Sequence, residues 1–219
     1  MTEKGIQKEE VKGVGIGTPG PVNDEGVVLK AVNLGWDVVN VSQTLSGLID
    51  LPVKAGNDAN VAALGEMWKG GGQGYKNLVA VTLGTGVGGG IILDGKLLNG
   101  THGAGGELGH MVLNPKETAI CGCGKRGCVE QYCSATGIVR MAKLEMEASS
   151  DPSVLRNAEK LTCKDIFDAG RQGDQLALKV LDQYYAYMGE FLANVCAVGN
   201  PGDAYEFLKP GAEVPAPAA

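Results

Sequence analysis

The chain has 219 residues, 44% of them hydrophobic and 20% charged, a balance typical of a globular protein that buries a sizeable core. Its formal net charge of -6 argues against nucleic acid as the main partner. No apolar run approaches the roughly 18 residues that a membrane span needs. The polar first ten residues do not form a secretory signal, so we expect a cytoplasmic location without membrane association.

The first quarter of the chain predicts short strands separated by turns. Residues 11–16 favour a strand, and "GTPGPV" at 17–22 ends it with two prolines. Ser42 is predicted to cap a short helix that continues to Ile49. A second strand is predicted within "LPVKAGND" at 51–58.

A helix and a strand meander follow. Asp58 is predicted as the N-cap of a helix over 59–68. Two apolar strands, 78–83 and 90–93, flank a glycine-rich turn. Asp94-Gly95 is a preferred dipeptide for a hairpin turn into a third strand. This arrangement predicts a meander rather than a strand-to-helix dinucleotide-binding unit.

The last third is predicted to be helical. A helix is expected over about 134–148, then a mobile connector over 149–161. Residues 162–165 have the pattern of a capping box. Apolar residues at helical spacing predict the longest helix over about 174–198, with its aromatic and Met stripe in the core. The Pro/Ala-rich residues 201–219 are expected to be disordered.

The stretch "CGCGKRGCVE" places three of the six cysteines together. Cys121, Cys123 and Cys128 are close enough in sequence for their sulfurs to converge on one ion. Zinc prefers four tetrahedral ligands, and His110, eleven positions before Cys121, is the fourth candidate. A Cys₃His site would be structural, because it leaves no open position for water. Such a site would also fix Glu130, two residues beyond the last cysteine.

Three other interpretations of this cluster remain. In the first, the cysteines would be free thiols in a surface loop. In the second, they would hold an iron–sulfur cluster, which normally takes four cysteines. A zinc-ribbon module for nucleic acid is the third, but only Lys125 and Arg126 supply basic charge around the loop.

Together with the cysteine stretch, "GELGHM" at 106–111 resembles the ROK family of sugar kinases and repressors, and within it the bacterial glucokinases. "GIGTPGPV", "NLGW", "GNDANVAALGE" and "LGTGVGGGIILDGK" match the other blocks of that family in the same order. The resemblance covers roughly residues 11 to 200, and several linked motifs are far more specific than one.

The resemblance implies an α/β, actin-like (ribonuclease H-like) ATPase fold of sugar kinases, with a hexose and ATP meeting in a cleft between two lobes. Residues 11–75 would be the remnant of the N-terminal lobe and 76–200 the C-terminal lobe, both incomplete, with 201–219 as a tail. ATP would enter with Mg²⁺ as co-substrate, and Zn²⁺ would be structural.

The resemblance also implies roles for individual residues. Asp58 would be the general base that takes a proton from the sugar, and Asn57, Asp58, Glu107, His110 and Glu130 would bind the sugar. The ATP-phosphate segment would comprise Gly86, Val87, Gly88, Gly89, Gly90, Ile91, Ile92 and Leu93. The zinc ligands would be His110, Cys121, Cys123 and Cys128.

Each role has a simpler explanation from the residues alone. Asp is a favoured N-cap whatever the chemistry, and glycine-rich hairpin turns are common without phosphate. The glycine-rich turn also lacks the Lys-Ser/Thr ending of a P-loop. Two glutamates such as Glu107 and Glu130 are ordinarily exposed surface groups.

Two blocks expected from the family are not found. An Asp-x-Gly-Gly-Thr phosphate loop does not occur in residues 1–13, and no glycine-rich adenosine loop follows Asn200-Pro201. Phosphoryl transfer depends on positioning and on neutralising the charge of the γ-phosphate, so we expect this chain alone to be weakly active or inactive. Unpaired sheet edges favour association, and we expect a homo-oligomer.

The substrate and the class of protein remain open. Glucose is the first candidate, with N-acetylmannosamine, N-acetylglucosamine, fructose and mannose as alternatives, and the donor is ATP or polyphosphate. A fragment of a sugar-responsive repressor is a second class, although its helix-turn-helix domain is not found here. A non-catalytic sugar-binding module is a third.

Overall fold

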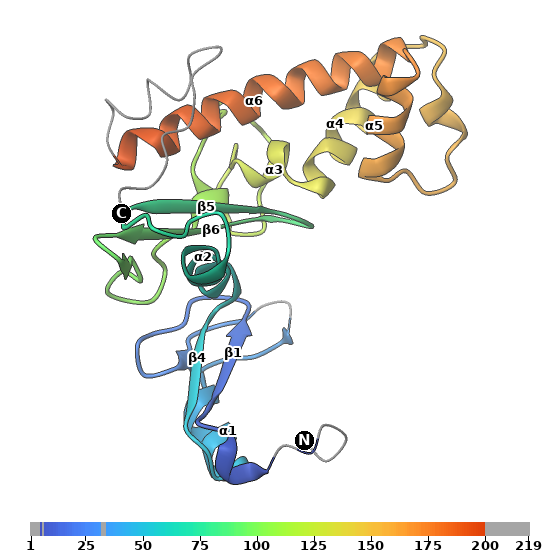
Figure 1. Ribbon diagram of the computed structural model, residues 1–219. Helices are drawn as coiled ribbons and strands as arrows, with labels where there is room; N and C mark the ends of the chain where they lie inside the picture. The colour runs from blue at the N-terminus through green and yellow to red at the C-terminus, as the bar shows by residue number, and fades with distance from the viewer. Residues whose placement is uncertain (1–4, 6, 32–33, 200–219) are drawn as a thin grey trace. The chain divides into compact units, whose positions relative to one another are not determined.

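The computed structural model describes residues 5, 7–31 and 34–199 (Figure 1). Its contacts form two compact units. Within the described ranges, the first contains residues 5, 7–31, 34–80 and 90–106, and the second contains 81–89 and 107–199. Among the helices in the described ranges, none has the length and apolar character to cross a membrane.

The first unit is built on a parallel strand pair. Strand β1 (Val14–Thr18) pairs with β4 (Val53–Asn57), with Val14 opposite Val53. The antiparallel strands β2 (Val27–Val28) and β3 (Val39–Asn40) form a second small sheet. A 3₁₀ turn, η2 (Lys8–Glu10), precedes β1. The core here consists of Val22, Val28, Ala31 and Val41, with Ile16, Val39, Leu45 and Ala55 packed against it.

Helix α1 (Val41–Ile49) begins two residues earlier than predicted. Its N-cap is Asn40, whose Oδ1 accepts a hydrogen bond of 2.9 Å from Gln43 N. The predicted cap, Ser42, is wrong, because its hydroxyl instead accepts a hydrogen bond of 3.0 Å from Ala55 N on β4. Ser42 therefore joins the helix to the parallel strand pair.

Helix α2 (Asp58–Lys69) also begins one residue earlier than predicted. Asn57 is its N-cap, since Asn57 Oδ1 accepts a hydrogen bond of 3.1 Å from Asn60 N, so the prediction that Asp58 caps this helix is wrong. Asn and Asp are similarly favoured at this position, and sequence alone does not choose between neighbours. Asp58 is instead the first helical residue, where the helix dipole favours a carboxylate.

The meander is confirmed as a three-stranded sheet in the order β5-β6-β7. The strands are β5 (Leu78–Leu83), β6 (Val87–Leu93) and β7 (Lys96–Leu97), so β6 begins three residues earlier than predicted. Asp94 and Gly95 connect β6 to β7 with positive φ angles of 50° and 74°, as the preferred turn dipeptide requires.

Helices dominate the second unit. The long helix α6 (Gln175–Gly199) packs against α4 (Ala135–Ala148), α5 (Cys163–Arg171) and the short α3 (Glu130–Cys133) (Figure 1). The prediction of a core stripe on α6 holds for Leu176, Val180, Leu181, Phe191 and Val195, which are buried, whereas Tyr184 and Met188 are half-buried and Leu192 is exposed.

The segment 149–161 is held in place rather than mobile, contrary to the prediction. It contains a 3₁₀ turn, η5 (Val154–Asn157), with Leu155 buried. Asp174 accepts hydrogen bonds from Ser153 Oγ at 3.0 Å and from Val154 N at 2.8 Å. The predicted capping box of α5 is confirmed at Thr162. The predicted disorder of 201–219 concerns residues outside the described ranges.

Candidate functional site

The four predicted metal ligands lie together in the second unit. One donor atom each from His110, Cys121, Cys123 and Cys128 lies within 4.8 Å of all the others. The sulfurs of Cys123 and Cys128 are 3.6 Å apart, and Cys121 Sγ is 3.8 Å from His110 Nδ1. A tetrahedral zinc site with Zn–S bonds of about 2.3 Å has sulfurs about 3.8 Å apart, so these residues fit that ion.

Glycines allow the chain to form this loop. Gly124 N donates to Cys121 O at 2.8 Å, and Cys121 N donates to Lys125 O at 2.7 Å, which closes a tight turn around the first two sulfurs. Gly127 has a φ of +72°, and a Cβ there would lie 1.8 Å from Asn114 O. A side chain at Gly127 would therefore force the backbone apart just before the last cysteine.

The thiols influence one another electrostatically. Burial, reinforced by the neighbouring Cys123 and Cys121, raises the pKa of the Cys128 thiol to about 12. Burial likewise raises the pKa of Cys121. At Cys123 burial acts in the same direction, but hydrogen bonds from the Lys125 backbone and the other two thiols outweigh it and lower the pKa. A divalent cation favours the thiolate forms, so this donor set suits zinc.

His110 lies between the cysteines and a carboxylate. It ends the short 3₁₀ turn η4 (Leu108–His110), which directly follows Glu107. Its Nδ1 is directed at Cys121, whereas its Nε2 lies 3.9 Å from Glu107 Oε2. The two side chains, three residues apart, lie on the same side of this turn. One ring nitrogen thus faces the metal cluster and the other faces a polar acceptor.

Glu130 connects the cysteine loop to the glycine-rich loop between β5 and β6. Its Oε2 accepts a hydrogen bond of 3.1 Å from Val87 N, and its Oε1 lies 4.0 Å from Cys121 Sγ. A Cβ on Gly86 would lie 2.1 Å from Glu130 Oε2. The carboxylate therefore occupies space that only a glycine at position 86 leaves free.

The predicted phosphate segment, residues 86–93, lies mainly along β6. Its residues from Gly89 to Ile92 are buried in the sheet, whereas the preceding loop at Gly84 and Thr85 is exposed. That loop is anchored to the start of α4, because Ala135 N donates to Gly84 O at 2.9 Å and Thr136 Oγ1 donates to Thr85 O at 2.7 Å. The phosphate role of the segment stays a prediction.

Asn57 and Asp58 lie together in the first unit, at the junction of β4 and α2. The Asn57 side chain is buried, and beyond capping α2 its Nδ2 donates to Gly20 O at 3.1 Å. Asp58 is exposed, and its Oδ1 accepts a hydrogen bond of 2.8 Å from Ala59 N. The sugar-binding candidates are thus divided between the units. Asn57 and Asp58 lie in the first unit, and Glu107, His110 and Glu130 lie in the second.

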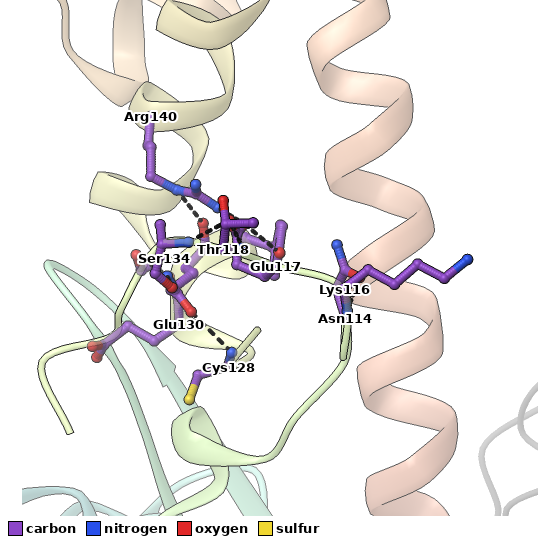
Figure 2. Close-up of polar contacts among 11 residues, drawn as sticks. Asn114, Lys116, Glu117, Thr118, Cys128, Glu130, Ser134 and Arg140 are labelled. Atoms are coloured by element: carbon purple, nitrogen blue, oxygen red, sulfur yellow. Dashed lines mark hydrogen bonds and ion pairs between the residues drawn. The ribbon is translucent and has the colours of Figure 1, made fainter. Parts of the chain in front are cut away.

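Sequence reasoning missed a partly buried polar network beside the metal loop. Tyr132 OH and Arg140 Nη2 donate to Glu117 Oε2 at 2.6 and 2.7 Å, and the backbone N–H groups of Thr118 and Ala119 donate to its Oε1. Figure 2 shows Glu117 and Arg140 facing each other, with Glu130 directed away from them.

The network lowers the pKa of Glu117 to about 2. Burial alone would raise that pKa, but the hydrogen bonds from Tyr132, the Ala119 backbone and Arg140 outweigh it. Because the three side chains lie 15 and 23 residues apart along the chain, no local motif connects them.

Comparisons with known proteins place these motifs in one family. The family model described as "ROK family" matches residues 2–203. A glucokinase of Halalkalibacterium halodurans is 43% identical over 198 residues, which are 89% of this chain and 60% of that protein. A xylose repressor of Caldicellulosiruptor bescii is 32% identical over 92% of this chain and 52% of the repressor.

Solved structures give the same result. The crystal structure of a ROK family glucokinase from Streptomyces griseus, in complex with glucose and AMPPNP, matches with a TM-score of 0.75 and 36% identity, over 87% of this chain and 63% of that one. The chain thus spans about 60% of the length of its curated glucokinase relatives. With its family model, motif order and mixed α/β fold in agreement over that partial length, the chain belongs to the ROK family.

Proposed function

We propose that this protein is an ATP-dependent hexose kinase that converts glucose to glucose 6-phosphate. The observation that carries the proposal is the 43% identity to a glucokinase, compared with 32% to the xylose repressor. The glucose and AMPPNP held by the Streptomyces griseus relative support the choice of sugar and of a nucleotide donor.

Asp58 is the proposed general base. A sugar hydroxyl is a poor nucleophile, and a carboxylate that accepts its proton as the bond to phosphorus forms accelerates the transfer. Asp58 is exposed, and Ala59 N holds its Oδ1. The proton would pass to the other oxygen, Oδ2.

Glu107, His110 and Glu130 are the proposed sugar ligands of the second unit. Carboxylate oxygens accept hydrogen bonds, and a hexose presents several hydroxyl donors. His110 Nε2, directed away from the cysteines, is the ring nitrogen that would meet a hydroxyl. The cysteine loop and the sugar ligands would then move as one unit.

The proposed zinc site is structural. His110 Nδ1 and the sulfurs of Cys121, Cys123 and Cys128 would hold the ion, with all four positions filled by protein. Bound zinc supplies fixed geometry to a loop with few apolar side chains, and it adds no reactive water.

Sugar binding tests the proposal separately from turnover. Glucose should raise the Tm of the chain, and Glu130→Gln should remove most of this shift. Glu147→Gln, an exposed glutamate on α4, is the matched control and should keep it. No glucose-dependent shift in the wild-type chain would contradict the proposal.

The catalytic role needs a second measurement. Because the chain alone is expected to be weakly active or inactive, the assay compares the low level of glucose 6-phosphate formed with ATP, which should fall to background in Asp58→Asn while the glucose-dependent Tm shift remains. Asp37→Asn, another exposed aspartate of the first unit, should behave as the wild type.

A sugar-responsive regulator is the second candidate, because repressors also match the chain. A Tm shift with xylose and none with glucose would favour it. N-acetylmannosamine, N-acetylglucosamine, fructose and mannose complete the panel that distinguishes the remaining sugars.

A further inference from the structure

Gln131 closes the cysteine loop from both ends. Its Oε1 accepts a hydrogen bond of 3.1 Å from Cys128 N, and its Nε2 donates a hydrogen bond of 3.1 Å to Ala119 O. Ala119 lies two residues before Cys121, the first cysteine of the cluster, and Cys128 is the last. A single side chain on α3 therefore joins the segment that enters the loop to the segment that leaves it.

The contact with Cys128 is reciprocal. Gln131 N also donates to Cys128 O at 2.9 Å, so both the backbone N–H and the backbone C=O of Cys128 are hydrogen-bonded to Gln131. This resembles a capping box, in which a side chain at the start of a helix reaches back to a backbone N–H. The last cysteine is thereby tied to the first turn of α3.

The other end of the loop is held just as firmly. Ala119 N donates to Glu117 Oε1 at 2.9 Å, while Ala119 O accepts from Gln131. Between these anchors, Ile120 and Arg126 form an isolated antiparallel bridge. The backbone N–H and the backbone C=O of Ala119 are thus each hydrogen-bonded to a side chain that is not a metal ligand.

Metal binding requires four donors in one place at once. A loop with free ends would lose conformational entropy when the donors gather, and this loss opposes binding. Partners that orient metal ligands without touching the metal contribute strongly to affinity. Gln131 fixes the separation of the two ends, and Cys121, Cys123 and Cys128 then face one another across a closed loop.

We propose that Gln131 is a positioning residue for the metal site, which pre-organises the cysteines and slows loss of the ion. This inference rests on the proposed zinc site. It assigns to Gln131 no contact with the metal or with a sugar.

The test compares zinc release from two matched variants of the zinc-loaded chain. Gln131→Met keeps the length of the side chain but removes its donor and acceptor. Gln73→Met removes a hydrogen bond of the same kind in the first unit, where Gln73 Nε2 donates to Trp68 O at 2.8 Å. Zinc transfer to a chromogenic chelator should be about tenfold faster in Gln131→Met than in the wild type, and unchanged in Gln73→Met.

Two further measurements separate positioning from loss of fold or of a ligand. Far-UV circular dichroism should be unchanged, and the cobalt-substituted variant should keep the thiolate-to-metal absorption of the wild type, because all four ligands remain. Gln131→Glu serves if Gln131→Met does not fold. It still accepts from Cys128 N but cannot donate to Ala119 O, so it should also release zinc faster than the wild type.

The outcomes are distinguishable. Release from Gln131→Met, or from Gln131→Glu in its place, at the wild-type rate overturns the role of Gln131 and leaves the zinc site intact. A wild-type chain that holds no zinc overturns the zinc site and this inference together.

Discussion

Glu130 and Val87 are joined by a hydrogen bond of 3.1 Å from the Val87 backbone to Glu130 Oε2, while Oε1 of the same carboxylate lies 4.0 Å from Cys121 Sγ. The glycine-rich loop and the cysteine loop therefore share one acidic side chain. A change in either loop is expected to reach the other through Glu130.

Gly86→Ala should weaken sugar binding without touching the sugar. The new Cβ would lie 2.1 Å from Glu130 Oε2, so the carboxylate must leave Val87 N. We expect about a tenfold loss of glucose affinity, the effect of about 1.4 kcal/mol, measured by calorimetric titration. Gly84→Ala is the control, because no atom lies within 4 Å of a Cβ there. Equal affinities for the two variants would contradict the orientation assigned to Glu130.

His110→Ala should reduce bound zinc well below one ion per chain, because a three-cysteine site lacks the fourth tetrahedral ligand. Loss of the ion should also lower the Tm, since a ligand that binds only the folded state stabilises it. Elemental analysis and a thermal melt measure both effects. His102→Ala removes the other histidine, and wild-type zinc content is expected there. Undiminished zinc in His110→Ala would remove His110 from the ligand set.

Stability at low pH should depend on Glu117. Its pKa in the folded state is about 2, below the usual value of an unfolded glutamate, so its stabilising contribution is present near neutral pH and is lost as the pH falls toward 2. The shift corresponds to a contribution on the order of 3 kcal/mol at neutral pH.

Denaturant titrations of Glu117→Gln and the wild type between pH 7 and pH 2 test this dependence. The difference in the free energy of unfolding should be largest above about pH 5 and should shrink as the pH is lowered. The exposed Glu147→Gln should show little difference at any pH. A constant difference for Glu117→Gln would exclude a titrating contribution from this carboxylate.

Substitutions at Gly127 and Gly124 distinguish two reasons for glycine in the cysteine loop, which are a positive φ angle and lack of space for a Cβ. Both have positive φ angles, 72° and 86°, but only at Gly127 would a Cβ collide with the backbone, 1.8 Å from Asn114 O. Gly124→Ala should cost about 1–2 kcal/mol from backbone strain alone. Gly127→Ala should cost clearly more and release zinc faster, as measured by denaturation and by chelator competition. Similar losses for the two variants would mean that the collision is relieved cheaply.

The sequence predicted best those features whose residues are close together in the chain. Three cysteines within eight positions restrict their own separation, and the Asp94-Gly95 turn is set by two backbone angles. The structure confirms that the three sulfurs lie together and that Asp94 and Gly95 form the turn. The helix caps at Ser42 and Asp58 were each misplaced because several neighbouring residues favour the same position.

Features that depend on distant residues were not predictable. Glu117, Tyr132 and Arg140 meet only because α3 and α4 turn back toward the chain before the cysteines. The polar connector 149–161 was predicted to be mobile, yet Asp174, which follows α5 in the sequence, accepts hydrogen bonds from it. Tertiary hydrogen bonds of this kind leave no periodic trace in a sequence.

Gly90 changes how the run "GVGGG" is to be interpreted. A Cβ at that position would lie 2.5 Å from Ala63 Cβ and 3.0 Å from Ala59 O, so β6 can approach α2 this closely only with hydrogen as the side chain. This requirement belongs to packing and would persist in a chain that never meets a nucleotide. Glycine at position 90 is therefore a poor diagnostic of kinase activity, and an enzymatic assignment gains more from Asp58.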